Sequence, residues 1–176
     1  MAFADPKQIV RQFAVGEGWH VADFGTGSGA YALALVEKVG HEGRVYAVDI
    51  QKDLLVRVKN EAKTRGFLNL EIVWGNIEEA GGSKLRDNSM DAVIASNILF
   101  QLENKKGCVR EVSRVLKQNG RALVVDWTDS FGGLGPRQNM VIPENETKEL
   151  FQKEGFIYEQ SIPAGDHHYG IIFKKK

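Results

Sequence analysis

Apolar and polar positions divide the chain into two alternating kinds of segment. Five short runs are predicted as strands, and several of them are apolar without a strict period of two, which is typical of strands that are buried on both faces of a parallel sheet. These runs lie at residues 20–24, 44–49, 70–74, 90–96 and 121–125. Because parallel strands need connections that cross one face of the sheet, helices are expected between them.

The segments between the strands have the spacing of helices. In 28–39, the residues Tyr31, Leu35 and Val39 fall on one face, and 53–65 has a similar apolar stripe. A further stripe consists of Val109, Val112, Val115 and Leu116. The alternation predicts an α/β fold, a Rossmann-like three-layer sandwich around a mostly parallel sheet.

The last part of the chain departs from this alternation. A helix is predicted at 147–154, and two strand-like runs follow at 156–162 and 169–174. The link between these runs, 163–168, is too short for a crossover helix, so the two strands should form an antiparallel hairpin. The sequence therefore predicts a seven-stranded sheet that is mostly parallel and ends in a C-terminal antiparallel hairpin.

Length and composition fit a single domain over residues 1–176. Within it, 1–17 is predicted as a short N-terminal helical segment, because Asp5 and Pro6 suit the start of a helix. The glycine-containing stretch 127–143 is predicted as a mobile loop. Lys plus Arg and Asp plus Glu both number 23, so the composition gives no strong sign of nucleic-acid binding.

The cysteine content and the length of the apolar stretches indicate where in the cell the protein is located. The chain has one cysteine, which excludes an intramolecular disulfide framework and any cysteine-rich zinc site. No apolar stretch approaches the ~20 residues of a membrane-spanning helix. We therefore expect a cytoplasmic protein with no membrane span.

The most informative motif lies between the first strand and the following helix, where residues 23–29 read DFGTGSG. Its glycines allow a tight turn and a close approach of the backbone to a ligand at a helix N-terminus. Asp49 ends the second strand, where an acid is suited to accept both hydroxyls of a ribose. We expect Asp49→Ala to weaken ligand binding but, as a change at a surface strand end, to leave stability without ligand almost unchanged.

Asp23 separates two ligand classes that use such a loop. A carboxylate in the glycine turn would repel the pyrophosphate of NAD, but it would attract an amino group. S-adenosylmethionine carries an amino group and no phosphate, so the sequence favours it as the cofactor. An NAD-binding oxidoreductase and a catalytically inactive adenosyl-binding module are the alternatives.

The motif at 23–29, Asp49 and the final hairpin together resemble the class I S-adenosylmethionine-dependent methyltransferases, over residues from about 18 to 176. The resemblance implies in-line transfer of a methyl group from the sulfonium of the cofactor. The stretch from Asp126 to Arg137 resembles the corresponding loop of the ubiquinone- and menaquinone-biosynthesis methyltransferases. Those enzymes methylate carbon or oxygen in small molecules, which implies a small-molecule acceptor.

The resemblance also implies which residues hold the cofactor. In the family, the acid matching Asp23 binds the methionine amino group and the acid matching Asp49 binds the ribose. Asn76 and Ile77 match the position that grips adenine, although many members have Asp in place of Asn76. Asn97 is expected to touch the cofactor through its backbone. The expected cofactor residues are Asp23, Gly25, Thr26, Gly27, Gly29, Asp49, Ile50, Asn76, Ile77 and Asn97.

The acceptor side is marked less clearly, because methyl transfer from a sulfonium needs mainly approach geometry and the exclusion of water. We predict that 127–143 and 163–168 close over the methyl group at the carboxyl edge of the sheet. His168, His167 and Arg137 are the candidate catalytic residues, since histidine titrates near neutral pH. No metal site is expected.

Overall fold

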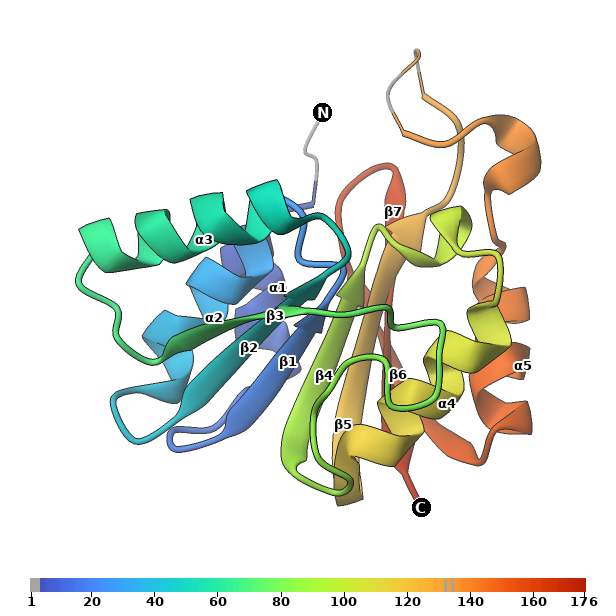
Figure 1. Cartoon of the computed structure of the whole chain (residues 1–176). Helices are drawn as coiled ribbons and strands as arrows, with labels where there is room; N and C mark the ends of the chain where they lie inside the picture. The colour runs from blue at the N-terminus through green and yellow to red at the C-terminus, as the bar shows by residue number, and fades with distance from the viewer. Residues whose placement is uncertain (1–3, 132, 134) are drawn as a thin grey trace.

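The computed structural model describes residues 4–131, 133 and 135–176. These residues form one seven-stranded sheet with helices on both faces (Figure 1). The strands are β1 (His20–Phe24), β2 (Arg44–Asp49), β3 (Leu70–Trp74), β4 (Met90–Ser96), β5 (Leu116–Trp127), β6 (Phe156–Pro163) and β7 (His168–Lys175). The helices are α1 (Pro6–Phe13), α2 (Ala30–Val39), α3 (Lys52–Thr64), α4 (Lys105–Val115) and α5 (Glu144–Lys153), with the 3-10 turns η1 (Leu99–Gln101) and η2 (Gln138–Met140).

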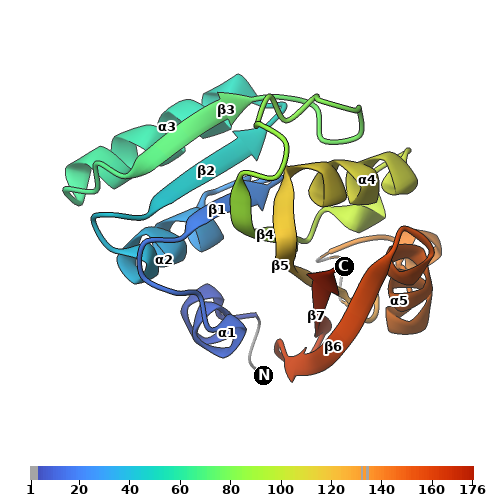
Figure 2. The same cartoon turned by 90° about the horizontal axis from the view of Figure 1, so that it is seen from below.

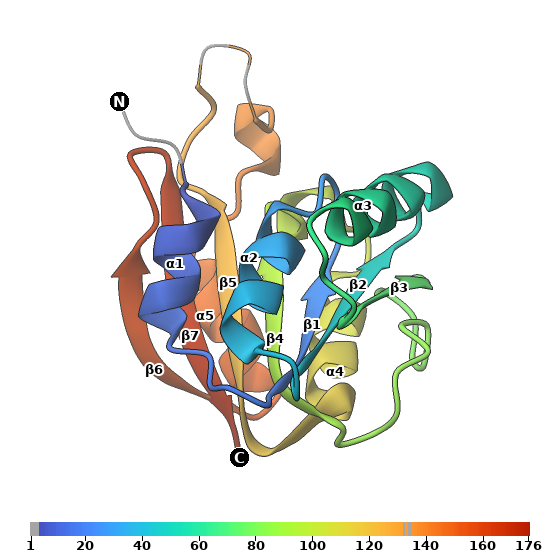
Figure 3. The same ribbon diagram turned by 90° about the vertical axis from the view of Figure 1, so that its left-hand side faces the viewer.

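The strand order is β3-β2-β1-β4-β5-β7-β6. The first five strands run parallel, whereas β7 is antiparallel to both β5 and β6 (Figure 2). Helices α1, α2 and α3 cover one face, and α4 and α5 cover the other (Figure 3). The predicted three-layer α/β fold and its C-terminal hairpin are confirmed.

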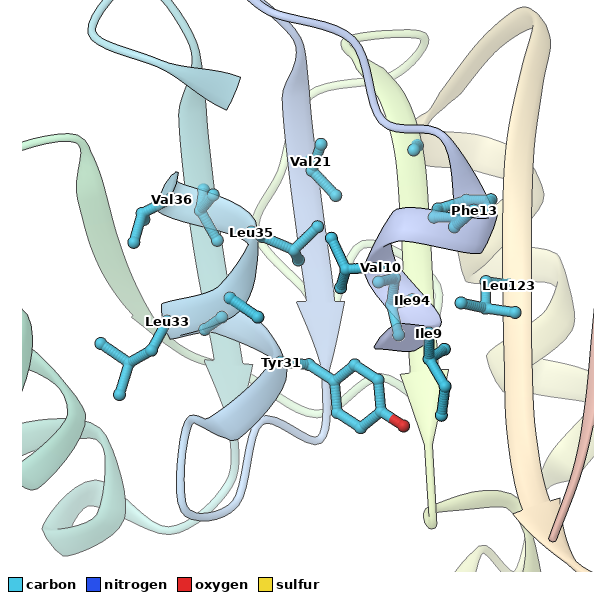
Figure 4. Packing of buried hydrophobic residues seen from close by; sticks show 14 of the residues in the cluster. Ile9, Val10, Phe13, Val21, Tyr31, Leu33, Leu35, Val36, Ile94 and Leu123 are labelled. Atoms are coloured by element: carbon cyan, nitrogen blue, oxygen red, sulfur yellow. The ribbon is translucent and has the colours of Figure 1, made fainter. Parts of the chain in front are cut away.

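Successive residues of each strand pack alternately into two apolar cores, one on each face of the sheet. Along β4, Ile94 packs under α1 and α2, whereas its neighbours Val93 and Ala95 face α4 and α5. Figure 4 shows Val10 of α1 and Leu35 of α2 converging on the strands. Each such fully buried aliphatic side chain stabilises the fold by about 1.5–3 kcal/mol.

Helix α1 begins at Pro6 with Asp5 as its N-cap, where the sequence predicted the start of a helix. Asp5 caps the helix by accepting hydrogen bonds from the amides of Lys7 (2.9 Å) and Gln8 (3.4 Å). Gln12 donates to the carbonyl oxygen of Pro163 at 3.0 Å, which ties α1 to the end of β6. The helix therefore spans the gap between α2 and the C-terminal hairpin, and its N-terminus lies at the carboxyl edge of the sheet (Figure 3).

Two element boundaries differ from the sequence prediction by three residues or more. Leu116, predicted on the stripe of a helix, instead opens β5 and pairs with Met90. An irregularity in the pairing follows, within which Asn119 takes a left-handed conformation (φ 65°), and pairing with β4 resumes at Arg121. Helix α5 begins at Glu144, three residues earlier than predicted, because Pro143 sets its entry and acidic residues favour the first turn.

The carboxyl edge of the sheet is stepped. In the register, Asp23 of β1 aligns through Ile94 with Leu123 of β5. Strand β5 continues four residues further to Trp127, a rise of about 13 Å at roughly 3.3 Å per residue. Trp127 pairs with His168 of β7, so β5 and β7 stand above β1 and β4 as a wall (Figure 1).

None of the helices among the described residues is long and apolar enough to cross a membrane.

Candidate functional site

The glycine loop between β1 and α2 has the backbone geometry that requires glycine. Gly25, Gly27 and Gly29 all have positive φ angles, of 71°, 52° and 81°. A Cβ on Gly29 would lie 2.6 Å from the side chain of Val58, and one on Gly25 would lie 2.7 Å from Ile98. The loop is thus packed closely from both sides.

Asp23 is a buried acid at the base of this loop. Only 2% of its surface is exposed, and its Oδ2 accepts a hydrogen bond of 2.7 Å from the hydroxyl of Thr26. Burial raises the pKa of Asp23 to about 6, and the negative charge of Asp49 acts in the same direction. A carboxylate in such a place gains from a cationic partner, which suits an amino group of a ligand.

Asp49 links the glycine loop to the end of β2. It is 8% exposed, and its two oxygens accept hydrogen bonds of 2.9 Å from the amides of Gly27 and Gln51. An ionised carboxylate has about four acceptor positions, so positions remain for two ribose hydroxyls. Because it also holds two backbone amides, Asp49 contributes to stability without ligand, and the sequence-based expectation of almost no effect is revised.

An apolar slot follows Asp49 along the edge. Ile77 forms its buried side (5% exposed), while Ile50 stands at its open side (64% exposed). The slot is lined by Gly25, Asp49, Ile50, Gly75, Asn76, Ile77, Glu78, Ile98 and Leu102. A slot between two aliphatic side chains suits a flat ring such as adenine.

Asn76 shapes the turn at the end of this slot. Its Oδ1 accepts from the amide of Glu78 at 3.0 Å, and its Nδ2 donates to Glu79 at 2.8 Å. The side chain that sequence reasoning assigned to adenine therefore also holds the local backbone, and any ligand contact shares its oxygen with Glu78.

Glu111 on α4 anchors the same loop, and sequence reasoning missed it. Its carboxylate is buried and accepts from the amides of Gly81 (2.8 Å) and Ser83 (3.0 Å), and from the guanidinium of Arg114. Burial alone would raise the pKa of Glu111, but Arg114, Ser83 and the backbone amides lower it to about 2. The Glu111–Arg114 spacing on one helix was the only trace of this network in the sequence.

A second cavity lies on the other side of the glycine loop. Its lining residues are Ala4, Pro6, Asp23, Gly25, Thr26, Gly27, Ser28, Ala30, Tyr31, Ser96, Asn97 and Gln101. Gly25 lines both this cavity and the apolar slot, so the two hollows adjoin at this residue, and together they are called the cleft below. Asp23 stands at one end of that cleft and Ile77 at the other.

Asn97 lies in this cavity in a left-handed conformation (φ 52°). Its amide donates to the carbonyl oxygen of Val125 at 2.8 Å, and its own carbonyl oxygen accepts from Gln101 at 2.8 Å. The backbone of Asn97, predicted to touch the cofactor, is therefore already bonded within the protein. The buried side-chain oxygen has no hydrogen-bond partner.

A sequence model of a family described as a methyltransferase domain matches residues 16–165 of this chain. The chain belongs to the class I S-adenosylmethionine-dependent methyltransferases. This membership decides between the two ligand classes, in favour of S-adenosylmethionine over NAD.

Similar proteins point the same way. A demethylmenaquinone methyltransferase of Listeria monocytogenes is 28% identical over 204 residues, covering 97% of this chain and 84% of that protein. One from Geobacillus stearothermophilus is 30% identical over 114 residues, covering 65% and 47%. The crystal structure of an S-adenosylmethionine-dependent methyltransferase from Aquifex aeolicus superimposes with a TM-score of 0.88 at 25% identity, covering 98% of this chain and 90% of that one. The chain spans about half the length of the first curated relatives that it matches.

In this methyltransferase the wall above the cleft carries Trp127, the first residue of the predicted loop, and His168, a candidate catalytic residue. The rings of Trp127 and His168 lie 4.2 Å apart between centroids, and alternation along β7 places His168 on the face covered by α1 and α2. His168 is 7% exposed and neither ring nitrogen has a hydrogen-bond partner. Burial lowers the pKa of His168, which keeps the imidazole neutral at neutral pH.

The loop after β5 packs against this wall. A Cβ on Gly135 would lie 2.8 Å from the Trp127 ring, so the loop folds back on the indole there. His167 is bound to the same loop, with its Nδ1 2.9 Å from Asp129 and its ring stacked on Phe131 at 4.1 Å. The loop and the hairpin turn thus lie side by side at the carboxyl edge, and their closure over the methyl group remains a prediction.

Arg137 is exposed and directly precedes η2. The carbonyl oxygen of Arg137 accepts a hydrogen bond from the amide of Met140. Of the three candidate catalytic residues, His168 is therefore the one that combines burial with unpaired nitrogens. Positions 132 and 134 of the predicted mobile loop lie outside the described residues.

Proposed function

We propose that this methyltransferase transfers the methyl group of S-adenosylmethionine to a small-molecule acceptor. The acceptor would lie in the corner between Asp23 and the wall formed by Trp127 and His168. The observation that carries this proposal is the pair of hollows that adjoin at Gly25, one with a buried acid for the amino group and the other with Asp49 and an apolar slot for adenine.

In the proposed reaction the acceptor atom attacks the methyl carbon in line with the bond to sulfur. The electron pair of that bond moves to sulfur, S-adenosylhomocysteine is formed, and the acceptor gives up a proton. His168 is the proposed base, because its buried, neutral imidazole has both nitrogens free of protein partners. Trp127 supplies an aromatic surface beside it.

Two acceptor classes are suggested by the names of the relatives, which include demethylmenaquinone and arsenite methyltransferases. The only cysteine, Cys108, is fully buried, and burial raises the pKa of its thiol to about 12. A soft, thiol-seeking acceptor such as arsenite therefore finds no thiolate ligand in this chain. We propose a hydroxylated aromatic ring, such as a naphthoquinol, as the acceptor.

Ligand binding is tested by thermal unfolding with S-adenosylhomocysteine and, separately, with NAD. At a hundred times the dissociation constant a ligand stabilises by about 2.7 kcal/mol. For a domain of this size, that raises the melting temperature by roughly 5–10 °C. A shift with NAD and none with the adenosyl ligand would overturn the proposal.

Turnover is tested by following S-adenosylhomocysteine formation with a demethylated naphthoquinol. We expect His168→Gln to lower kcat by roughly a hundredfold or more, as for a general base, without changing the affinity for S-adenosylhomocysteine. His20→Gln, at the opposite end of β1, is the matched control and should retain activity. If the wild type binds the cofactor but methylates neither the naphthoquinol nor arsenite, the inactive adenosyl-binding alternative is favoured.

A further inference from the structure

The ring of His168, the proposed base, is held by no polar atom of the described residues. Neither of its nitrogens has a hydrogen-bond partner, and the ring packs on Trp127 with 4.2 Å between the centroids. A catalytic base is usually oriented by a third group. The position of this ring therefore depends on the backbone that carries it, where the pairing of β5 with β7 ends at Trp127 and His168.

His167 fastens this end of the wall to the loop after β5 (Figure 1). Its carbonyl oxygen accepts a hydrogen bond of 2.9 Å from the amide of Thr128, which extends the pairing of the two strands. Its Nδ1 lies 2.9 and 3.0 Å from the two carboxylate oxygens of Asp129. Its ring stacks on Phe131, with the centroids 4.1 Å apart. One residue thus binds three positions of the loop.

The pairing of His167 with Asp129 has a direction. An ionised carboxylate only accepts hydrogen bonds, so the Nδ1 of His167 carries the proton. The side chain of His167 is 13% exposed, whereas that of Asp129 is 48% exposed. Because the imidazole of His167 is engaged both at Nδ1 and on a ring face, it is better suited to hold the loop than to meet an acceptor.

The same two residues act on the charge state of His168. Burial is the largest cause that lowers the pKa of His168; His167 lowers this pKa further, and the carboxylate of Asp129 raises it. One of these charged groups precedes His168 in the hairpin turn, and the other lies in the loop after β5. Opening the pair would therefore change the pKa of His168 through charge and through burial, and the two effects can be told apart.

We propose that His167 is a positioning residue, which together with Asp129 fixes the end of the wall so that the ring of His168 stays packed on Trp127 and faces the acceptor. This inference rests on the proposed function, in which His168 is the base. It gives His167, a catalytic candidate from the sequence, the task of holding the base.

The first test needs neither cofactor nor acceptor. The pKa of His168 is measured by NMR, with histidine rings labelled with ¹⁵N, in the wild type, His167→Ala and Asp129→Ala. If the pair positions the ring, both variants expose it, and both raise the pKa of His168 toward its ordinary value because burial is the largest cause of the shift. If the pair acts through charge alone, the two variants shift this pKa in opposite directions.

Opposite shifts, or no shift in Asp129→Ala, would overturn the proposal. Asp129→Ala removes a half-exposed side chain, so this variant is expected to fold even if His167→Ala does not. His41→Ala, which changes an exposed histidine that follows α2, is the matched control and should leave the pKa of His168 unchanged.

The second test uses turnover of a demethylated naphthoquinol. Each single variant should lower kcat by roughly tenfold to a hundredfold, as expected for a misplaced reacting group, without changing the affinity for S-adenosylhomocysteine. The double variant should lose no more than either single variant, and His167→Asn, whose amide can donate to Asp129, should recover part of kcat. Additive losses without recovery would contradict the pair. Failure of the wild type to bind S-adenosylhomocysteine would refute the proposed function, whereas the NMR test would still decide the role of His167.

Discussion

Asp49→Ala removes one carboxylate that serves two tasks, and the two effects can be measured separately. Without ligand, the amides of Gly27 and Gln51 lose their acceptor. Hydrogen bonds to charged groups contribute about 1.5–3 kcal/mol each, but both amides lie near the surface, where water can replace the lost partner. We therefore expect a loss of about 2 kcal/mol in the free energy of unfolding, or roughly 4–8 °C in the melting temperature.

The second effect is on the cofactor. The ribose hydroxyls lose a charged acceptor, which should lower the affinity for S-adenosylhomocysteine by roughly tenfold to a hundredfold. Asp49→Asn keeps one acceptor oxygen and should lie between the wild type and Asp49→Ala in both measurements.

Urea unfolding without ligand measures the first effect, and calorimetric titration measures the second. Glu42→Ala, an exposed acid that follows α2, is the control and should stay within about 0.5 kcal/mol of the wild type. If Asp49→Ala unfolds at the same urea concentration as the wild type, its bonds to the glycine loop do not stabilise the fold. If its affinity is unchanged, the ribose binds elsewhere.

Two further predictions concern the same loop. The pKa of Asp23 is about 6 in the folded protein and about 3.8 in the unfolded chain, so the native state holds an extra proton between these values and stability falls as pH rises from about 4 to 6. A ligand ammonium favours the ionised acid, so binding of S-adenosylhomocysteine at pH 6, where Asp23 is about half protonated, should release up to about half a proton. A calorimetric enthalpy that is the same in buffers of different ionisation enthalpy would contradict this pairing. Gly29→Ala should destabilise the protein more than Gly18→Ala, since both have positive φ but only the former meets a neighbour, Val58. Unfolding of the double variant Gly29→Ala/Val58→Ala should then show partial rescue, whereas purely additive losses would refute the contact.

The parts of the fold that the sequence predicted are those encoded locally. The strands are recognisable from the pattern of their apolar residues. The glycine loop is recognisable because its backbone conformation requires glycine. The boundary at Leu116 was misplaced because an apolar residue after a helical stripe fits the helix pattern equally well. Only its pairing with Met90 across the sheet makes it a strand residue, and that contact has no local trace.

The same reasoning explains which site residues were found. Asp23 and Asp49 flank motifs with fixed spacing, and their placement followed from the strands that carry them. Glu111 was missed because its backbone partners, Gly81 and Ser83, lie about thirty residues away in an irregular loop. Tyr31 was counted as part of the apolar face of its helix, and its ring is indeed buried there. The residue also lines the cavity that contains Asp23, which the helical pattern does not indicate.

The polar atoms that find no partner in the fold show where ligands should act. The hydroxyl of Tyr31, the Oδ1 of Asn97 and both nitrogens of His168 are buried and unpaired near the carboxyl edge, and the Oδ2 of Asp126 is a further such atom at the end of β5. Each such group costs roughly 1–3 kcal/mol when it stays unpaired. A cofactor and an acceptor that pair them would return part of that free energy as binding affinity. The unpaired groups at this edge therefore lower the stability of the fold and raise its affinity for a ligand. Such a compromise between stability and binding is expected of a functional site and not of a hydrophobic core.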